Sequence, residues 1–305
     1  MAHVVCIGSM LVDELYFSSD HILPETSNPA TVVKSAGGVM FNVARNLSLL
    51  QVDVRFIASI GSDTDANYLT SQLHACGISS ENLISSNAPT GKYVSFLQPD
   101  GSLFAAACAD AATSAITKEV LVDKSELLLS ASLILADTNL ELSTLSWLIE
   151  FCRLHNKLLI VEPVSVSKAG KLSAVSLDGI FMITPNEDEV KALSGLHENL
   201  LSVTQLQNRG AKMIWVRKGK EGSTLFQKSE MLDIPVPEIT VVDSTGAGDA
   251  ALAGWVAAYL DGRSLEECVK TGHAIAMETL QCRGSVNDNI SKDKLYSLLR
   301  KYYAV

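Results

Sequence analysis

Strand-like and helix-like segments alternate regularly through the middle of the chain. Helical patterns over residues 117–129 and 141–155 alternate with short apolar strand patterns over residues 133–136 and 158–162. This alternation is typical of a parallel sheet covered by helices. With 305 residues, of which 47% are hydrophobic and 19% charged, the chain is long enough to bury a large core of this type. We therefore expect an α/β fold.

Two segments do not fit this alternation. Short strand patterns and turn-rich stretches occupy residues 14–35 and 90–108. The second segment contains Pro99-Asp100-Gly101 between two β-rich runs, which is typical of a hairpin. We predict that both segments form a small β-sheet lid, inserted in the α/β core of a single domain over residues 1–305.

The charge of the chain limits its partners. The net charge is −10, and Lys and Arg are not clustered, so we expect no nucleic-acid binding. An anionic substrate would need local cations, such as a metal ion.

Cysteine spacing and hydropathy indicate the compartment. The six cysteines lack CxxC spacing and the density of small secreted domains, which favours reduced thiols. A strand-like segment at residues 3–7 stands where a signal peptide would, and no apolar run reaches membrane-spanning length. We expect a cytoplasmic protein without a membrane partner.

Residues 243–249 read DSTGAGD and lead into an apolar, helix-like segment. Gly246 and Gly248 allow the backbone to approach a ligand closely, and the positive end of a helix that starts there attracts anions. Asp249 falls in the first turn of that helix, where it could accept a hydroxyl proton during phosphoryl transfer. An ordinary helix with a hydroxyl side chain at its N-cap would explain the same residues.

Other polar residues follow predicted strands or glycine turns. Asp13 follows the first strand, where open α/β sheets place their ligands, and it could bind sugar hydroxyls. A glycine pair ending at Gly38 permits close approach of a ligand, and Asn42 lies one turn into the next helix. Asp137 and Glu162 end successive strands and should share one sheet edge. A turn-capping aspartate, a plain loop and a solvated helix residue are the structural alternatives.

Two further stretches could bind a nucleotide. Asn186 and Glu189 are three residues apart on a helix and could hold a water-coordinated magnesium ion, although acidic residues at 187–189 also suit a helix N-terminus. Residues 218–223 are basic and glycine-rich but lack the spacing of a Walker A loop. They form either a charged hairpin or a backbone segment that lies, together with a cation, beside the phosphates of a nucleotide.

The order of these motifs, from GxxxxD through GGxxxN, NEDE and RKGKEG to DSTGAGD, resembles the PfkB (ribokinase-like) family of carbohydrate kinases over almost the whole chain. The resemblance implies a central, mostly parallel sheet flanked by helices, with a small β-sheet lid over the sugar. It implies an ATP-dependent transfer of phosphate to an alcohol, with Mg²⁺ and, in many members, K⁺.

The resemblance also implies roles for individual residues. Asp249 matches the general base, and the segment from Gly246 through Ala247 to Gly248 matches the anion hole for the transferred phosphate. The other matches are the sugar-contacting positions Asp13, Gly38, Asn42 and Asp137, the magnesium and phosphate element Asn186 and Glu189, the nucleotide loop Lys218, Gly219 and Gly222, the adenine-bordering His273 and Met277, and the monovalent-cation positions Asp243 and Thr245.

Within the family, residues 27–29, 37–39, 137–139 and 162–165 resemble the pseudouridine kinases. That subgroup transfers the γ-phosphate of ATP to the 5′-hydroxyl of pseudouridine. Leu11 stands where ribokinases carry a sugar-binding asparagine, which argues against free ribose as the substrate.

Other functions fit the same motifs. A ribokinase, a fructokinase or an adenosine or inosine kinase would share them, and a non-catalytic nucleoside or sugar sensor could keep the fold. Asp249 weighs against a sensor, and the absence of GxGxxG after the first strand excludes a dinucleotide dehydrogenase. Glu162 replaces the usual aspartate before proline, which bears on metal handling. The lid has open edges that could pair two subunits in a homodimer.

Overall fold

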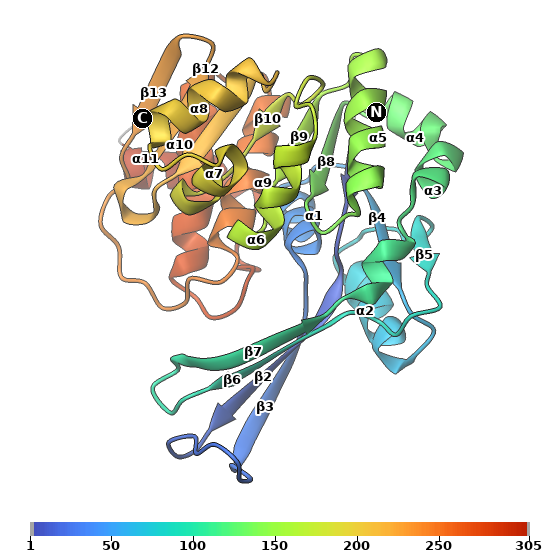
Figure 1. Cartoon of the computed structure of the whole chain (residues 1–305). Helices are drawn as coiled ribbons and strands as arrows, with labels where there is room; N and C mark the ends of the chain where they lie inside the picture. Colours follow the sequence, from blue (N-terminus) through green and yellow to red (C-terminus); the bar gives the residue numbers. More distant parts are fainter. Residues whose placement is uncertain (1–2, 304–305) are drawn as a thin grey trace.

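Two sheets organise residues 3–303, which are the residues that the computed structural model describes (Figure 1). Within that range, the large sheet comprises β1 (Val4–Ile7), β4 (Val54–Ile60), β5 (Leu83–Ser85), β8 (Leu133–Asp137), β9 (Leu159–Glu162), β10 (Met182–Ile183), β11 (Met213–Arg217), β12 (Ser223–Gln227) and β13 (Glu230–Ile234). Their order is β13-β12-β11-β10-β9-β8-β1-β4-β5. In this order, neighbouring strands from β11 through β10, β9, β8, β1 and β4 to β5 pair in parallel, and β12 and β13 add an antiparallel edge.

Helices cover both faces of the large sheet (Figure 1). They are α1 (Val39–Leu49), α2 (Thr64–Ala75), η1 (Ala111–Ala115), α3 (Lys118–Asp123), α4 (Ser125–Ser130), α5 (Leu142–Leu154), α6 (Val166–Ala169), η2 (Gly170–Ala174), α7 (Glu187–Ser194), α8 (Asn199–Asn208), η3 (Gly219–Glu221), α9 (Ala247–Leu260), α10 (Leu265–Leu280) and α11 (Lys292–Tyr303). None of the helices within residues 3–303 is both long and apolar enough to cross a bilayer.

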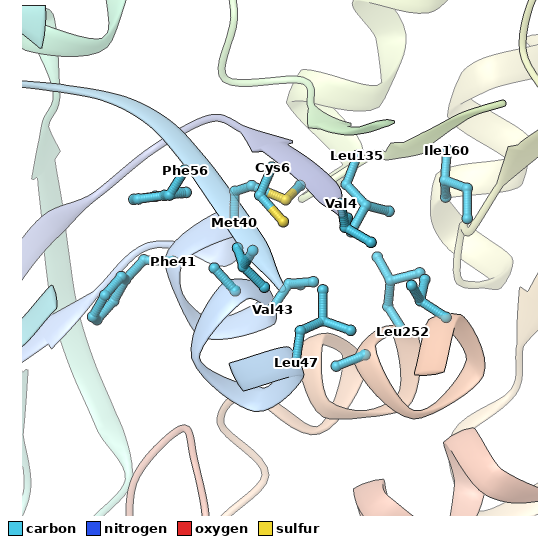
Figure 2. Close-up of a cluster of buried hydrophobic side chains, with 14 of the residues drawn as sticks. Val4, Cys6, Met40, Phe41, Val43, Leu47, Phe56, Leu135, Ile160 and Leu252 are labelled. Atoms are coloured by element: carbon cyan, nitrogen blue, oxygen red, sulfur yellow. The ribbon is translucent and has the colours of Figure 1, made fainter. Parts of the chain in front are cut away.

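The side chains of β1 alternate between two buried clusters. Val4 and Cys6 join the cluster formed with α1, α2 and α9, while Val5 and Ile7 join the cluster formed with α5, α7 and α8. Successive residues of a strand point to opposite faces, so a strand covered on both sides is apolar throughout. Figure 2 shows the first cluster, in which Leu252 of α9 lies beside residues of β1 and α1.

The helix expected over residues 117–129 is two short helices. Helix α3 ends before Lys124, and α4 begins after it. Thr117 caps α3 by accepting a hydrogen bond from the Val120 amide. Lys124 has a non-helical backbone, and its ammonium donates to the Asn82 side chain at 2.9 Å. The break therefore coincides with a tertiary contact that hydrophobic periodicity does not register.

The second sheet is small and separate, as expected from residues 14–35 and 90–108. It comprises β2 (Leu11–Ser18), β3 (Ala30–Gly37), β6 (Lys92–Leu97) and β7 (Leu103–Ala109), in the order β3-β2-β6-β7. It projects from the helical body in Figure 1. Strand β2 begins earlier than expected because Leu11 and Val12 pair with the end of β3. Of the predicted domain, residues 1–2 and 304–305 lie outside the described residues.

Candidate active site

Helix α9 begins with a tight glycine turn. Gly246 is the N-cap residue, in a left-handed conformation with φ of 73°. A Cβ at this position would lie 2.1 Å from the Ser285 carbonyl oxygen, so only glycine fits. The hydroxyl N-cap considered from sequence is absent, because no side chain within the described residues caps α9. The amides that start at Gly246, Ala247 and Gly248 therefore remain available to an anion.

Asp249 lies in the first turn of α9 and is buried. The Asn42 side-chain amide donates to Asp249 Oδ2 at 2.8 Å, and the Ser285 hydroxyl donates to the Asn42 side-chain oxygen Oδ1 at 3.0 Å. Asn42 is held in α1, whose N-cap residue is Gly38. Within the described residues, Asp249 Oδ1 receives no hydrogen bond. This oxygen is free to accept a proton.

The surroundings of Asp249 favour its neutral form. Burial raises the pKa of its carboxyl to about 8, and the hydrogen bond from Asn42 opposes part of that rise. Glu162 and Asp137 raise the pKa further, whereas the Arg217 guanidinium lowers it. A carboxyl with a pKa near 8 can both take and release a proton close to neutral pH, which suits a general base.

Asp13, on β2 of the small sheet, is half-buried. It accepts no hydrogen bond from the described residues, and burial raises the pKa of its carboxyl to about 6. Asp13 pairs across the sheet with Ser35 and Tyr93. A carboxylate without protein donors in this place is available for the hydroxyls of a bound sugar.

Asp137, at the end of β8, differs from Asp13 because its oxygens are occupied. The amide and hydroxyl of Ser9 donate to Oδ2 at 3.2 and 3.4 Å, and the Asn139 amide donates to Oδ1 at 2.9 Å. Complete burial raises its pKa to about 6. Asp137 thus fixes the loops after β1 and β8, and the expected sugar contact would come from Ser9 and Asn139 as much as from Asp137.

Lys168, which the sequence motifs did not indicate, belongs to the same group. Its ammonium donates to the Asn139 side-chain carbonyl. The charge of Lys168 also lowers the pKa values of Asp137, Cys108 and Asp110, although burial raises each of them more strongly. Lys168 is therefore a cation between the end of β8 and the small sheet. A lone lysine on a short helix gives no sequence signal for this role.

Asn186 and Glu189 form the N-terminal cap of α7. The Asn186 side chain accepts from the Glu189 amide, and the Glu189 carboxylate accepts from the Asn186 amide, both at 2.9 Å. This capping box uses both side chains for local structure. Burial raises the pKa of Glu189, whose Oε2 lies 3.9 Å from the Arg217 guanidinium.

No group of three or more His, Cys, Asp or Glu side chains within residues 3–303 is placed to hold a metal ion. Mg²⁺ in kinases keeps several waters and is bound largely through substrate phosphates. The second carboxylate oxygen of Glu189 has no partner within the described residues, and it fits a water-mediated contact to such an ion.

The basic loop joins β11 to β12 through η3. Lys218 and Gly222 pair through their backbones at 2.8 Å, with Gly219 between them. The Lys218 ammonium forms an ion pair with Asp233 at 2.6 Å, on the neighbouring strand β13. Arg217, one residue earlier, points the other way and lies against Gly248. A cation that lies beside the glycine loop at Gly248 is therefore Arg217, which sequence reasoning missed.

His273 and Met277 are buried on α10. The ring nitrogens of His273 contact the Ser223 hydroxyl at 2.7 Å and the Tyr303 hydroxyl at 2.8 Å. Burial lowers the pKa of His273 to about 4, so the ring is neutral. These contacts anchor α10 to β12 and α11, and they leave neither ring nitrogen free for a nucleotide.

Asp243 joins two loops near the start of α9. Its carboxylate accepts from the Thr245 and Gly284 amides, both at 2.9 Å. These bonds lower the pKa of Asp243 despite partial burial. Asp243 therefore brings the backbone of residues 243–245 next to Gly284.

The model of the pfkB family of carbohydrate kinases matches residues 1–292. The chain belongs to this family. A pfkB kinase is a phosphotransferase, and the buried carboxylate beside a glycine turn suits that chemistry.

Individual relatives agree with the family match. The pseudouridine kinase of Escherichia coli (strain K12) is 29% identical over 304 residues, which cover 97% of this chain and 96% of the relative. The structure of Arabidopsis thaliana ribokinase complexed with ribose and ATP aligns with a TM-score of 0.86 and 26% identity, over 98% of this chain and 99% of that one. A carbohydrate kinase from Agrobacterium tumefaciens aligns with a TM-score of 0.85 and 29% identity, over 98% and 97% of the two chains. The expected ribokinase-like α/β fold is confirmed.

Proposed function

We propose that this pfkB kinase uses ATP to phosphorylate the 5′-hydroxyl of pseudouridine. The observation that carries the phosphoryl-transfer chemistry is the placement of Asp249, with one free carboxylate oxygen, in the first turn of α9 beside the Gly246 loop. The similarity to a pseudouridine kinase over nearly the whole chain supports the choice of acceptor.

The reaction needs a base, an anion site and a leaving group. The acceptor hydroxyl gives its proton to Asp249 as its oxygen forms a bond to the γ-phosphorus, and the bond between that phosphorus and the β–γ bridging oxygen breaks to release ADP. The amides at Gly246, Ala247 and Gly248 would stabilise the phosphoryl oxygens. Asn42 keeps the Asp249 carboxyl pointed at the acceptor through its 2.8 Å hydrogen bond.

Ions and nucleotide would bind around this centre. Magnesium bound with ATP would neutralise phosphate charge, with the second oxygen of Glu189 acting on it through water and Asn186 holding Glu189 in place. A potassium ion near Asp243 and Thr245 would sit behind the glycine loop. Lys218, Gly219 and Gly222 would face the nucleotide. Helix α10 would border the adenine through residues other than His273, because both ring nitrogens of His273 already contact protein hydroxyl groups.

The acceptor would lie between the end of β8 and the small sheet, which serves as a lid. Asp13 would bind ribose hydroxyls, near Gly38 at the start of α1. Asn139 and Lys168 offer an amide and an ammonium that can pair with the carbonyl and N–H groups of a uracil ring. Closure of the lid would exclude water, which protects ATP from hydrolysis.

A coupled assay of ATP consumption tests the acceptor. Pseudouridine, uridine, ribose, fructose, adenosine and inosine are compared at a fixed ATP concentration, and the largest kcat/KM is expected for pseudouridine. Lys168→Met should lower the preference for pseudouridine over ribose by about 10-fold, since it loses one charged hydrogen bond. A greater kcat/KM for ribose, fructose, adenosine or inosine would assign the enzyme to that acceptor. Binding without turnover of any acceptor would make the protein a sensor.

We also propose that the chain is one kinase domain that forms a homodimer through the lid. Strands β3 and β7 are the edges of the small sheet, and both are largely exposed. Apolar side chains also lie on its surface, including Val32, Val33 and Phe96. Light scattering is expected to give the mass of two chains, and Val33→Lys is expected to give the mass of one.

All six cysteines are free thiols, and three of them are buried. Free thiols persist in a reducing compartment, so we propose a cytoplasmic location. Fractionation of cells that express the tagged protein would check it.

A further inference from the structure

Arg217 connects the end of β11 to the glycine loop of α9. Its Nη2 donates to Glu162 Oε1 at 2.7 Å and to the Thr184 carbonyl oxygen at 2.5 Å. Its Nη1 lies against Gly248, where a Cβ would come within 2.4 Å of that nitrogen. The guanidinium is therefore anchored on one side and touches the loop on the other.

Glu162 is a buried anchor. It is 4% exposed, and the Thr184 hydroxyl donates to its Oε2 at 2.5 Å. The buried carboxylate requires the partly buried guanidinium of Arg217, because an unpaired charge in the interior is strongly unfavourable. Glu162 therefore fixes where the Arg217 guanidinium lies.

Arg217 keeps hydrogen-bonding capacity that this anchor does not use. Its Nε is buried without a partner, and within the described residues Nη1 makes no hydrogen bond. A purely structural arginine in the interior would be expected to satisfy more of its five N–H groups. The unused donors include the nitrogen that faces Gly248.

The charges around Asp249 come from several elements. Glu162 of β9 and Asp137 of β8 raise the pKa of Asp249, whereas Arg217 of β11 lowers it. Arg217 itself stays protonated, because Glu162 and Glu189 outweigh the effect of burial and raise its pKa. Arg217 and Glu162 thus act on Asp249 in opposite directions.

We propose that Arg217, held by Glu162, is a positioning residue for phosphoryl transfer: it supports the anion-binding loop at Gly248 with a fixed positive charge and balances the carboxylates around Asp249. The same chemistry explains why an apolar strand ends in a partly buried arginine. This inference rests on the proposed role of Asp249 but not on which acceptor the enzyme uses.

Opposite shifts in the pH profile test the proposal. Profiles of kcat/KM are measured for Arg217→Met and Glu162→Gln with the best acceptor of the panel. In Arg217→Met the acidic limb should move up by about one pH unit or more, with turnover falling at least about 10-fold. In Glu162→Gln the limb should move down. If Arg217 and Glu162 only stabilise the fold, the acidic limbs of both variants should lie at the same pH as in wild type or should move in the same direction. Either result would overturn the proposal.

Two further variants keep the test decisive. Arg217→Lys retains the positive charge, so the acidic limb of the pH profile should stay near its wild-type position. Turnover should nevertheless fall, because lysine cannot reproduce the two hydrogen bonds that Arg217 Nη2 donates to Glu162 and Thr184. If Arg217→Met does not fold, as judged by thermal melting, Glu162→Gln decides alone, and an unmoved limb overturns the proposal. Undiminished turnover in Asp249→Asn would instead show that Asp249 is not the general base. That result would overturn the proposed function, and it is distinguishable from a failure of the proposal for Arg217.

Discussion

The two sheets of this kinase use apolar residues in opposite ways. In the large sheet, every residue of β1, β8 and β9 is buried. In the small sheet, every residue of β7 and the first five of β3 are exposed. Each sheet nevertheless places an aspartate in the site, Asp137 from β8 and Asp13 from β2.

The hydrogen bonding of their carboxylates suggests different roles for the large-sheet body and the small sheet. Both oxygens of Asp137 accept from protein donors, and Asp249 is held by Asn42, so we propose that the large-sheet body fixes the geometry of the reaction. Asp13 accepts no hydrogen bond from residues 3–303, and it lies on the small sheet, whose edge strands are largely exposed. The body should therefore control stability and turnover, and the small sheet should control binding of the acceptor.

The largest expected effect is on stability. Leu252 is completely buried between α9 and β1 (Figure 2). Leu252→Ala should lower the free energy of unfolding by about 2–5 kcal/mol, because it removes buried methyl groups and leaves a cavity. Urea denaturation followed by circular dichroism measures the loss.

Val32 on β3 is the matched control, since it is 54% exposed. Val32→Ala should change the free energy of unfolding by no more than about 0.5 kcal/mol in the monomer. Both variants are compared in the monomeric Val33→Lys background, where a loss as large as that of Leu252→Ala would break the comparison.

A smaller effect is expected from the carboxylate of the small sheet. Asp13→Ala removes charged hydrogen bonds to the acceptor, each worth about 1.5–3 kcal/mol, so the KM of the acceptor should rise about 10- to 100-fold. Steady-state kinetics at saturating acceptor should show a nearly unchanged KM for ATP. An equal rise in both KM values would contradict the division between the sheets.

A further effect is expected in the pH dependence of stability. Burial raises the pKa of Asp249 from 3.8 to about 8, so the folded protein binds more protons than the unfolded chain between those values. Stability from this group is therefore complete below about pH 4 and is lost as the pH rises through about 8. Urea titrations across this range should show a decline in wild type that is weaker in Asp249→Asn. Parallel curves would mean that Asp249 is ionised throughout.

The sequence predicted the architecture well, because alternation of apolar segments reports burial directly. The positions of the small sheet followed from Pro99-Asp100-Gly101 and the β-rich runs around it. The break at Lys124 was not predictable, since it depends on a contact with Asn82 from a distant segment.

The site was predicted in part. Asp249 and its glycines could be found because a glycine turn before a helix has a local chemical signature. Arg217 and Ser285 could not, because their partners come from other elements. An apolar strand that ends in arginine was the one signal for Arg217. The capping role of Asn186 and Glu189 was foreseen only as an alternative to ion binding.

The central claim is that Asp249 removes the proton from the acceptor. Single-turnover transfer of phosphate, measured beside calorimetric binding of ATP, tests it in Asp249→Asn. The asparagine retains the size and the contact with Asn42, so we expect ATP affinity within about twofold of wild type and transfer slower by at least about 10²-fold. Transfer at a near wild-type rate would contradict the account.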